Sequence, residues 1–226
     1  MDTILKANEL RRDILKVAIK NKQGHIAPSL SCLDILTVLH YKVASEQDTI
    51  ILSKGHGCYG LYAIWADLGL LAKEKWREFD LPGCVDGYGS LGHGLPVAAG
   101  VAYANKRLGN GKHTWVIVGD AEMQEGSCWE ALSFIWHHKL TNITVIVDDN
   151  GLQAMDRVEN ILCQNLFERF RSWGFMVYFC DGHNHDEIIR WLESKPIILI
   201  AYTTKGKGVE YMEGKAEWHF KCPETT

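Results

Sequence analysis

The chain has 226 residues, of which 46% are hydrophobic and 23% charged, and its formal net charge is −4. This length is enough for a domain with a well-buried core. The charge gives no general attraction to nucleic acid or to an anionic membrane surface. The longest apolar runs, at 115–118 and 197–201, are far too short to span a bilayer. The N-terminus is charged throughout and lacks the apolar centre of a signal peptide. We therefore expect neither nucleic acid nor a membrane as a partner.

The seven cysteines are scattered along the chain without CxxC spacing. An odd, dispersed set of this kind argues for reduced thiols in a cytoplasmic setting rather than for a disulfide framework. The same pattern argues against a zinc site. The sequence thus predicts a cytoplasmic protein.

The first part of the chain is predicted to be mainly helical. Apolar residues recur at intervals of about 3.6 over residues 3–22, which predicts an amphipathic helix. The stretch "HIAPSLSC" (25–32) is expected to break this helix, with Ser31 capping a second helix through residues 32–41. Thr49–Leu52 is a short apolar run and predicts a buried strand, which the glycine-rich turn "SKGHG" follows.

Two further helices are predicted on either side of a glycine-rich loop. Leu61, Ile64 and Leu68 share one face of the first of these helices. Residues 80–94, "DLPGCVDGYGSLGHG", are expected to form a loop because glycine is so frequent there. Residues 95–108 then predict a helix whose small side chains allow close packing.

The second half of the chain alternates strands and helices in a regular order. Its strands are solid apolar runs, as expected where helices cover both faces of a sheet. This alternation predicts an α/β fold with a doubly wound, mostly parallel sheet and helices on both faces. We expect residues 1–226 to form a single domain of this class. The predicted strands are 114–119, 143–148, 175–179 and 197–201, and the predicted helices are 126–139, 161–173 and 184–194.

An aspartate and an asparagine follow two consecutive predicted strands. Asp120 comes directly after strand 114–119, and Asn150 comes shortly after strand 143–148. Ligands of open parallel sheets bind at the carboxyl ends of the strands, and one crossover helix joins these two. Both side chains are therefore expected at the same sheet edge. Their oxygens suit Mg²⁺ or Ca²⁺, and Mg²⁺ often completes its shell with phosphate oxygens. The pair predicts a metal that tethers a phosphorylated cofactor, although either residue alone is more typical of a simple turn.

The wording around these two residues resembles a known signature. "GDAEMQEG" followed by "VIVDDNGLQ" resembles the thiamine diphosphate signature, which begins with GDG and ends at an asparagine one crossover unit later. Five further blocks resemble those of the transketolase family and occur in its order, so that the resemblance covers nearly the whole chain. They are "GHIAPSLSCLDILTVL", "ILSKGHGCYGLYA", "GSLGHGLPVAAGVAYA", "DGHNHDEI" and "TTKGKGVEYMEGKAEWHFKCP". The resemblance implies the thiamine diphosphate-binding fold and the diphosphate-binding half of a transketolase.

The resemblance also implies roles for the residues at the two ends of the signature. Asp120, Asn150 and the backbone carbonyl of Leu152 are expected to bind the metal, Mg²⁺ or alternatively Ca²⁺. Glycine near the diphosphate lets backbone N–H groups approach an anionic ligand closely. The residues expected to contact the cofactor here are Gly119, Asp120, Ala121, Glu122, Asn150 and Leu152.

Three histidines match cofactor-site positions of the family. The resemblance places His56 near the diphosphate, His25 near the thiazolium and substrate, and His219 near both the diphosphate and the donor substrate. His25 and His219 are therefore the candidate catalytic residues, because imidazoles can shuttle protons near neutral pH. An isolated histidine is more often structural than functional. The histidines that match no block, and that we interpret as structural, are His40, His113, His137 and His138.

The remaining matches concern the rest of the cofactor and a second site. Gly89, Ser90 and Leu91 resemble the segment that approaches the aminopyrimidine ring. Glu125 and Glu130 match acidic positions that, in the family, couple two cofactor sites across a dimer. The stretch "TTKGKGV" lacks the spacing of a phosphate-binding P-loop. We interpret it as a solvated basic turn near the diphosphate.

The sequence departs from the family pattern at three points. Ala121 replaces the middle residue of GDG, and its methyl group is tolerable if φ stays negative. No GHP-like histidine precedes "GYGSLGHG", and His93 stands where transketolases usually have glutamine. These departures affect the expected sugar-phosphate substrate more than the expected cofactor.

The family comparison also implies a partner. In the family, a following domain holds the aminopyrimidine and supplies a glutamate to it, and the sequence through Thr226 encodes no such domain. We therefore expect the pyrimidine-binding and C-terminal domains on a separately encoded subunit, in an α₂β₂ assembly.

Three hypotheses for the function follow. The first is a split, thiamine diphosphate-dependent transketolase that moves a two-carbon ketol unit from a ketose to an aldehyde, with small sugars as substrates. The second is a related subunit that decarboxylates a 2-oxo acid and passes on the acyl carbanion, in a specialised sugar or natural-product pathway. The third is a degenerate scaffold subunit without catalysis. The retained signature residues favour an enzyme, because a scaffold needs none of them.

Overall fold

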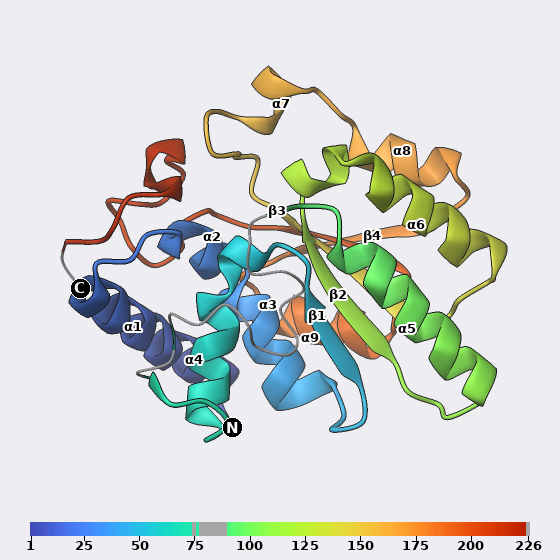
Figure 1. Cartoon of the computed structure of the whole chain (residues 1–226), viewed down its shortest axis with the longest axis horizontal. Helices are drawn as coiled ribbons and strands as arrows, with labels where there is room; N and C mark the ends of the chain where they lie inside the picture. Colours follow the sequence, from blue (N-terminus) through green and yellow to red (C-terminus); the bar gives the residue numbers. More distant parts are fainter. Residues whose placement is uncertain (74–75, 77–89, 225–226) are drawn as a thin grey trace.

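A five-stranded sheet runs through the centre of the structure, with helices on both sides (Figure 1). The computed structural model describes residues 1–73, 76 and 90–224. The described strands stand in the order β1-β2-β3-β5-β4, and every pairing between them is parallel. The predicted α/β class is confirmed, with an all-parallel sheet among the described residues. The strands are β1 (Thr49–Leu52), β2 (Thr114–Gly119), β3 (Ile143–Asp149), β4 (Val177–Asp181) and β5 (Ile198–Tyr202).

The helices divide between the two faces of this sheet. In Figure 1, α1 to α4 gather on one side of the strands, and α5, α6 and α8 gather on the other. Most bounds agree with the predicted elements to within two residues. The helices are α1 (Thr3–Asn21), α2 (Ile26–Ser31), α3 (Leu33–Val38), α4 (Tyr59–Asp67), α5 (Gly94–Leu108), α6 (Gly126–His137), α7 (Val158–Ile161), α8 (Leu166–Ser172) and α9 (His185–Glu193). Short helical turns occur at Leu39–Val43, Gly55–Gly57, Ala121–Gln124 and Ala216–His219.

Successive residues of the central strands enter two separate apolar cores. Trp115 and Ile117 of β2 belong to the core that contains residues of α1, α3, α4 and α9. Val116 and Val118 belong to the core that contains residues of α5, α6 and α8. Because side chains alternate across a strand, burial on both faces requires an unbroken apolar run. This explains why the strands read as solid rather than alternating.

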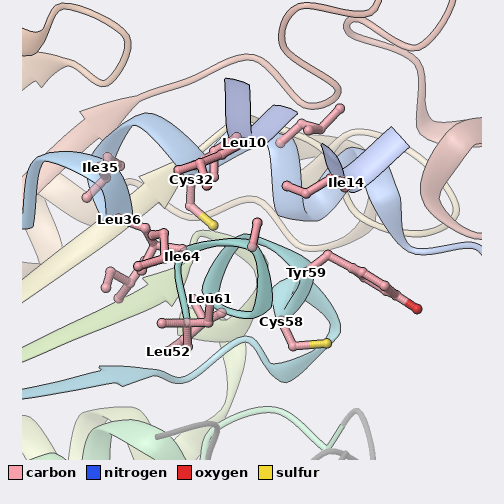
Figure 2. Close-up of a cluster of buried hydrophobic side chains, with 14 of the residues drawn as sticks. Leu10, Ile14, Cys32, Ile35, Leu36, Leu52, Cys58, Tyr59, Leu61 and Ile64 are labelled. Carbon is pink, nitrogen blue, oxygen red and sulfur yellow. The ribbon is translucent and has the colours of Figure 1, made fainter. Parts of the chain in front are cut away.

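Figure 2 shows part of the first core, where α1, α3, β1 and α4 meet. Leu10, Ile14, Leu36, Leu52 and Ile64 come from these four elements, and none is more than 2% exposed. Full burial of an aliphatic side chain of this size contributes about 1.5–3 kcal/mol. This packing holds the first helices against the sheet, next to the loop that follows β1.

The expected helix break at residues 25–32 is wrong. Ile26–Ser31 forms the helix α2, and Pro28 lies in its first turn, where a missing N–H leaves no intrahelical bond unmade. Ser31 does not cap the next helix, because α3 begins after Cys32 without a side-chain cap. The Ser31 hydroxyl instead donates to the carbonyl of Pro28 and to the carboxylate of Asp148.

The predicted helix at 161–173 is correct only in its second part. The short helix α7 ends at Ile161, and α8 begins at Leu166. Asn165 sets the start of α8, since its side-chain oxygen accepts a hydrogen bond from the backbone N–H of Glu168. Apolar periodicity ran through this boundary and concealed the cap.

The expected glycine-rich loop at 80–94 lies mostly outside the described residues. Its end is described, and α5 begins at Gly94, directly after His93. The described part of the chain contains no helix long and apolar enough to cross a membrane. Six cysteines fall within the described residues, and all six are free. The cytoplasmic location stays a prediction.

His113 is one of the histidines interpreted as structural, and its environment predicts a pH effect on stability. It lies just before β2, is 3% exposed, and its Nε2 pairs with the Thr144 hydroxyl at 3.0 Å. Burial, with the charge of Lys195, lowers its pKa from 6.5 to about 4. Between these two pH values the unfolded chain binds a proton that the folded chain does not. The contribution to stability is therefore complete above pH 6.5 and is lost as the pH falls toward 4.

We expect His113→Gln to remove part of this slope, by about 1–2 kcal/mol between the two pH values. Urea unfolding of the full chain at a series of pH values measures it. His137→Gln, at an exposed histidine of α6, is the matched control and should keep the wild-type slope. An unchanged slope in His113→Gln would contradict the account of the buried imidazole.

Candidate cofactor site

A cavity of about 410 Å³ opens where β1, β2 and β3 end. The register pairs Gly119 of β2 with Asp148 of β3, so the segments that follow these strands leave the sheet at the same level. Residues from distant parts of the sequence meet there. The lining residues are His25, Pro28, Lys54, His56, Leu91, Gly119, Asp120, Ala121, Glu122, Asn150, Leu152, Gln153, Ala154, Lys205, His219 and Phe220.

The three predicted metal ligands all line this cavity. Asp120 is 3% exposed, and its carboxylate accepts hydrogen bonds from the backbone N–H groups of Ala121 at 2.8 Å and Gly151 at 2.7 Å. The Oδ1 atom of Asn150 accepts a hydrogen bond from the backbone N–H of Leu152 at 3.1 Å. The structure thus brings together the two loops that the sequence placed at one sheet edge.

Acidic side chains are concentrated around Asp120. Burial raises its pKa to about 8, and the nearby carboxylates of Asp149 and Asp148 add to the effect. Among the described residues, no three His, Cys, Asp or Glu side chains form a metal-binding group. One carboxylate, one amide oxygen and one carbonyl oxygen fit a hard ion that keeps water and phosphate oxygens as further ligands.

The three predicted histidines converge in the same cavity. Their ring centroids are 5.4 Å apart for His25 and His219, 5.2 Å for His56 and His219, and 6.1 Å for His25 and His56. His25 adopts φ +59°, a conformation that is uncommon for a residue with a Cβ. Gly24 permits the close approach of the last segment, because a Cβ there would lie 1.9 Å from the carbonyl oxygen of Phe220.

These histidines are neutral near pH 7. Burial lowers the pKa of all three rings. The charge of Lys205 adds to the effect at His25 and His219, and the charge of Lys54 adds to it at His56. The pKa of His219 falls to about 3. Each ring therefore carries one N–H donor and one acceptor nitrogen.

Lys205 extends into this histidine group. It is 2% exposed, and its ammonium donates to the carbonyl of Gln153 at 2.8 Å and to that of Leu152 at 3.4 Å. It also contacts Nδ1 of His219 at 2.7 Å. Because an ammonium can only donate, Nδ1 accepts, and the N–H of the neutral ring is at Nε2. Burial, with repulsion from Lys54, lowers the pKa of Lys205 to about 8. The interpretation of this stretch as a solvated turn is wrong at Lys205.

A second buried lysine pairs with an aspartate beneath the cavity. The Lys54 ammonium contacts the carboxylate of Asp148 and donates to the Pro28 carbonyl at 2.7 Å. Ser31 and Thr203 donate their hydroxyls to the same carboxylate. Burial alone would raise the pKa of Asp148, but the Lys54 charge and these hydrogen bonds outweigh it and lower the pKa. The pair joins α2, β1 and β3 and stays ionised.

Glu122 ties the loop before α5 to the end of β2. Its carboxylate is 1% exposed and accepts from the Ser53 hydroxyl and from the backbone N–H groups of Gly92 at 2.9 Å and Gly119 at 3.1 Å. Burial raises the pKa of this carboxyl. Glu122 lines the cavity, but its hydrogen bonds hold the protein together.

The other predicted site residues lie in different places. Gly89 is outside the described residues, and Leu91 lines the cavity. Ser90 is exposed, with its hydroxyl 2.9 Å from Nε2 of His93. Glu125 and Glu130 are both exposed, directly before and within the first turns of α6. Their proposed coupling role stays a prediction.

The main residues that sequence reasoning missed are Lys54, Asp148, Lys205 and Gln153. Two signals were present: Lys54 follows a buried strand in "SKGHG", and Asp148 precedes Asn150 in "VDDN". A charged residue at the end of a buried strand is close to the ligand edge of such a sheet. The sequence alone did not show which of these charges are buried together.

An all-parallel sheet with this cavity at its carboxyl edge defines a cofactor-binding domain of the α/β class. The family described as "Transketolase, thiamine diphosphate binding domain" matches residues 7–222. The chain belongs to the transketolase family and is a thiamine diphosphate-binding domain of it. The resemblance seen in the sequence is thereby confirmed.

Relatives of known name agree with this assignment. The chain is 36% identical to one subunit of an apulose-4-phosphate transketolase of Actinobacillus succinogenes, over 97% of this chain and 90% of that protein. It is 34% identical to the corresponding subunit in Phocaeicola vulgatus, over 97% and 88%. Among solved structures, the transketolase of Campylobacter jejuni matches with a TM-score of 0.85 and 29% identity, over 98% of this chain. The chain spans only 41% of that transketolase.

The buried ion pair beneath the cavity predicts a large effect on stability. Lys54→Met should lower the free energy of unfolding by about 3–5 kcal/mol, because Asp148 is left charged, buried and without its ammonium. Urea denaturation of the full chain measures this change. Lys207→Met is the matched control, since Lys207 pairs with Glu213 at 3.9 Å in a partly exposed position. The control should change by less than about 1 kcal/mol, and an equally small change in Lys54→Met would contradict the ion pair.

Proposed function

We propose that this chain holds thiamine diphosphate and Mg²⁺ in the cavity at the end of β1, β2 and β3. Together with a second subunit, it transfers a two-carbon ketol unit from a ketose to an aldehyde. The observation that carries the proposal is the convergence of Asp120, Asn150 and Leu152 with three neutral histidines in one cavity. The names of the relatives support ketol transfer over the decarboxylase and scaffold alternatives.

The metal is the finer part of the cofactor proposal. Asp120, Asn150 and the carbonyl of Leu152 hold Mg²⁺, with Ca²⁺ as a substitute of the same chemistry. Two observations support a cation there: the concentration of acidic side chains around Asp120, and the contact of the Leu152 carbonyl with the Lys205 ammonium. Gly119 and Ala121 flank the diphosphate, and Ala121 is not among the described residues with positive φ.

The remaining residues bind the anion and handle protons. Lys205 offsets the charge of the diphosphate, while His56 and the Nε2–H of His219 donate hydrogen bonds to it. His25 lies beside the exposed Phe220 and exchanges a proton with a substrate hydroxyl. When bound, thiamine diphosphate supplies the carbanion chemistry of the reaction. Gly89, Ser90 and Leu91 approach the aminopyrimidine ring.

A partner completes the site in this proposal. Two relatives are each named as one of several lettered subunits of a transketolase, and such a name implies a second subunit. We propose that residues 1–226 form the diphosphate-binding domain, and that a separately encoded subunit contributes the pyrimidine-binding and C-terminal domains in an α₂β₂ assembly. Glu125 and Glu130, both exposed on α6, couple two such sites. The substrates are small sugars of the phosphorylated kind named in those relatives.

The activity test combines the chain with its partner subunit, thiamine diphosphate and Mg²⁺. A ketose phosphate and an aldehyde are offered in one arm, and pyruvate in the other. Ketose-dependent consumption of the aldehyde is the expected result. Release of carbon dioxide from pyruvate would select the decarboxylase instead, and the absence of turnover despite bound cofactor would select the scaffold.

The metal assignment predicts the effect of removing one charge. Asp120→Asn keeps the size of the side chain, and we expect it to abolish Mg²⁺-dependent retention of thiamine diphosphate by the complex. Equilibrium dialysis with and without EDTA measures retention. Asp156→Asn is the matched control, because this exposed carboxylate follows the same strand and hydrogen-bonds to Arg157 and Asn160 outside the cavity. Retention by Asp120→Asn that equals the control would show that the metal assignment is wrong.

A further inference from the structure

A buried carboxylate with four hydrogen-bond contacts lies outside the cofactor cavity. Asp34 of α3 is 5% exposed, and Nη2 of Arg11 lies 3.1 and 3.3 Å from its two oxygens. His183 contacts Oδ2 through Nδ1 at 2.7 Å, and His185 contacts Oδ1 through Nε2 at 3.2 Å. Burial alone would raise the pKa of Asp34, but these hydrogen bonds and the Arg11 charge outweigh it and hold the pKa well below its usual range. Asp34 is thus a carboxylate and only accepts.

The second nitrogen of His183 faces the loop after β5. Its Nε2 lies 2.8 Å from the backbone nitrogen of Thr204. Because a backbone N–H can only donate, Nε2 must be the acceptor, and the ring N–H is at Nδ1, where Asp34 accepts it. The carboxylate therefore selects the tautomer that the Thr204 amide requires. The opposite tautomer would place two donors against each other.

Thr204 lies in the segment that carries Lys205 into the cavity. Thr203 donates its hydroxyl to Asp148, and the N–H of Gly206 donates to the carbonyl of Ala27 in α2 at 3.0 Å. Gly208, with φ +85°, lies against Arg11 so closely that a Cβ would approach the arginine Cδ to 2.4 Å. The segment is thus fixed on both sides of Lys205, and the Thr204 amide is held by His183.

His185 provides a natural contrast within the same cluster. It contacts the same carboxylate and is also buried, but its Nδ1 faces the hydroxyl of Thr3 in α1 at 2.7 Å. Loss of His185 removes a contact of Asp34 without touching the segment at 203–206. Loss of His183 removes a similar contact and also releases the Thr204 amide.

We propose that Asp34 and His183 form a positioning pair for the cofactor cavity, in which the carboxylate fixes the imidazole tautomer that holds the Thr204 amide and thereby aims Lys205 at the diphosphate. The inference rests on the proposed function, since it assigns a support to the cofactor site described above. Neither residue belongs to the described lining of the cavity. Their effect is on cofactor binding, through the backbone before Lys205.

Three variants separate positioning from general stability. A glutamine amide reaches about as far as Nε2 of histidine, and an asparagine amide about as far as Nδ1. His183→Asn therefore keeps a donor for Asp34 and loses the Thr204 contact, whereas His183→Gln keeps an acceptor for Thr204. His185→Gln is the matched control. Binding of thiamine diphosphate with Mg²⁺ to the full chain is followed by the ³¹P signals of the cofactor, and thermal unfolding is measured beside it.

We expect His183→Asn to weaken cofactor binding about tenfold, the size of one lost hydrogen bond. His183→Gln should recover most of that loss, and His185→Gln should bind within about twofold of wild type even where its melting temperature falls as far. Equal weakening in His183→Asn and His185→Gln would overturn the positioning role while leaving the proposed function in place. Absence of binding by the wild type would instead contradict the proposed function.

A second measurement keeps the inference testable if His183→Asn does not fold. Amide hydrogen exchange should show the Thr204 N–H protected in the wild type and in His183→Gln. An unprotected Thr204 amide in the wild type would overturn the proposal.

Discussion

The parallel pairing of β2 with β3 is the constraint on which the rest of the site depends. Its register places Gly119 opposite Asp148, so that Asp120 and Asn150 emerge side by side at the carboxyl edge of the sheet. The hydrogen bond from the Gly151 N–H to the Asp120 carboxylate, 2.7 Å long, then closes the gap between the two loops. A slip of one residue would turn every side chain of the strand to the opposite face and separate the pair.

The electrostatics of the cavity follow from what that register buries. Asp148, at the end of β3, is neutralised from below by Lys54, whereas the Asp120 carboxylate is held by two backbone N–H groups and by no lysine among the described residues. On the opposite side, Lys205 and three neutral histidines present hydrogen-bond donors. The cavity thus has a cation-attracting wall and an anion-attracting wall, which is the arrangement that a metal-bound diphosphate requires.

The sequence predicted those parts of the structure that depend on local pattern. Solid apolar runs alternating with amphipathic ones are enough for a parallel sheet covered on both faces, and Asp120 and Asn150 could be placed because strand ends are recognisable in such a fold. Two local predictions were wrong for local reasons: Pro28 sits in a first helical turn, and Asn165 caps α8 inside an apolar run. The assignment to the transketolase family came from ordered motif blocks rather than from periodicity.

Long-range burial could not be predicted in the same way. Lys205 reads as part of a basic turn, and only the folded chain shows its ammonium against carbonyls more than fifty residues earlier. Asp34 and His183 are separated by 149 residues, and nothing in either local pattern indicates that they touch. Burial of a charge is a property of the assembled layers, because the partner that compensates it comes from another element.

The most direct test of this account is a crystal of the chain grown with thiamine diphosphate and Mn²⁺ in place of Mg²⁺. Anomalous scattering then locates the metal independently of the protein chemistry. The account predicts one strong peak within coordination distance of the Asp120 carboxylate, the Asn150 amide oxygen and the Leu152 carbonyl, with the diphosphate beside Lys205. Bound cofactor with its metal elsewhere, or with its diphosphate away from the carboxyl ends of β2 and β3, would contradict it.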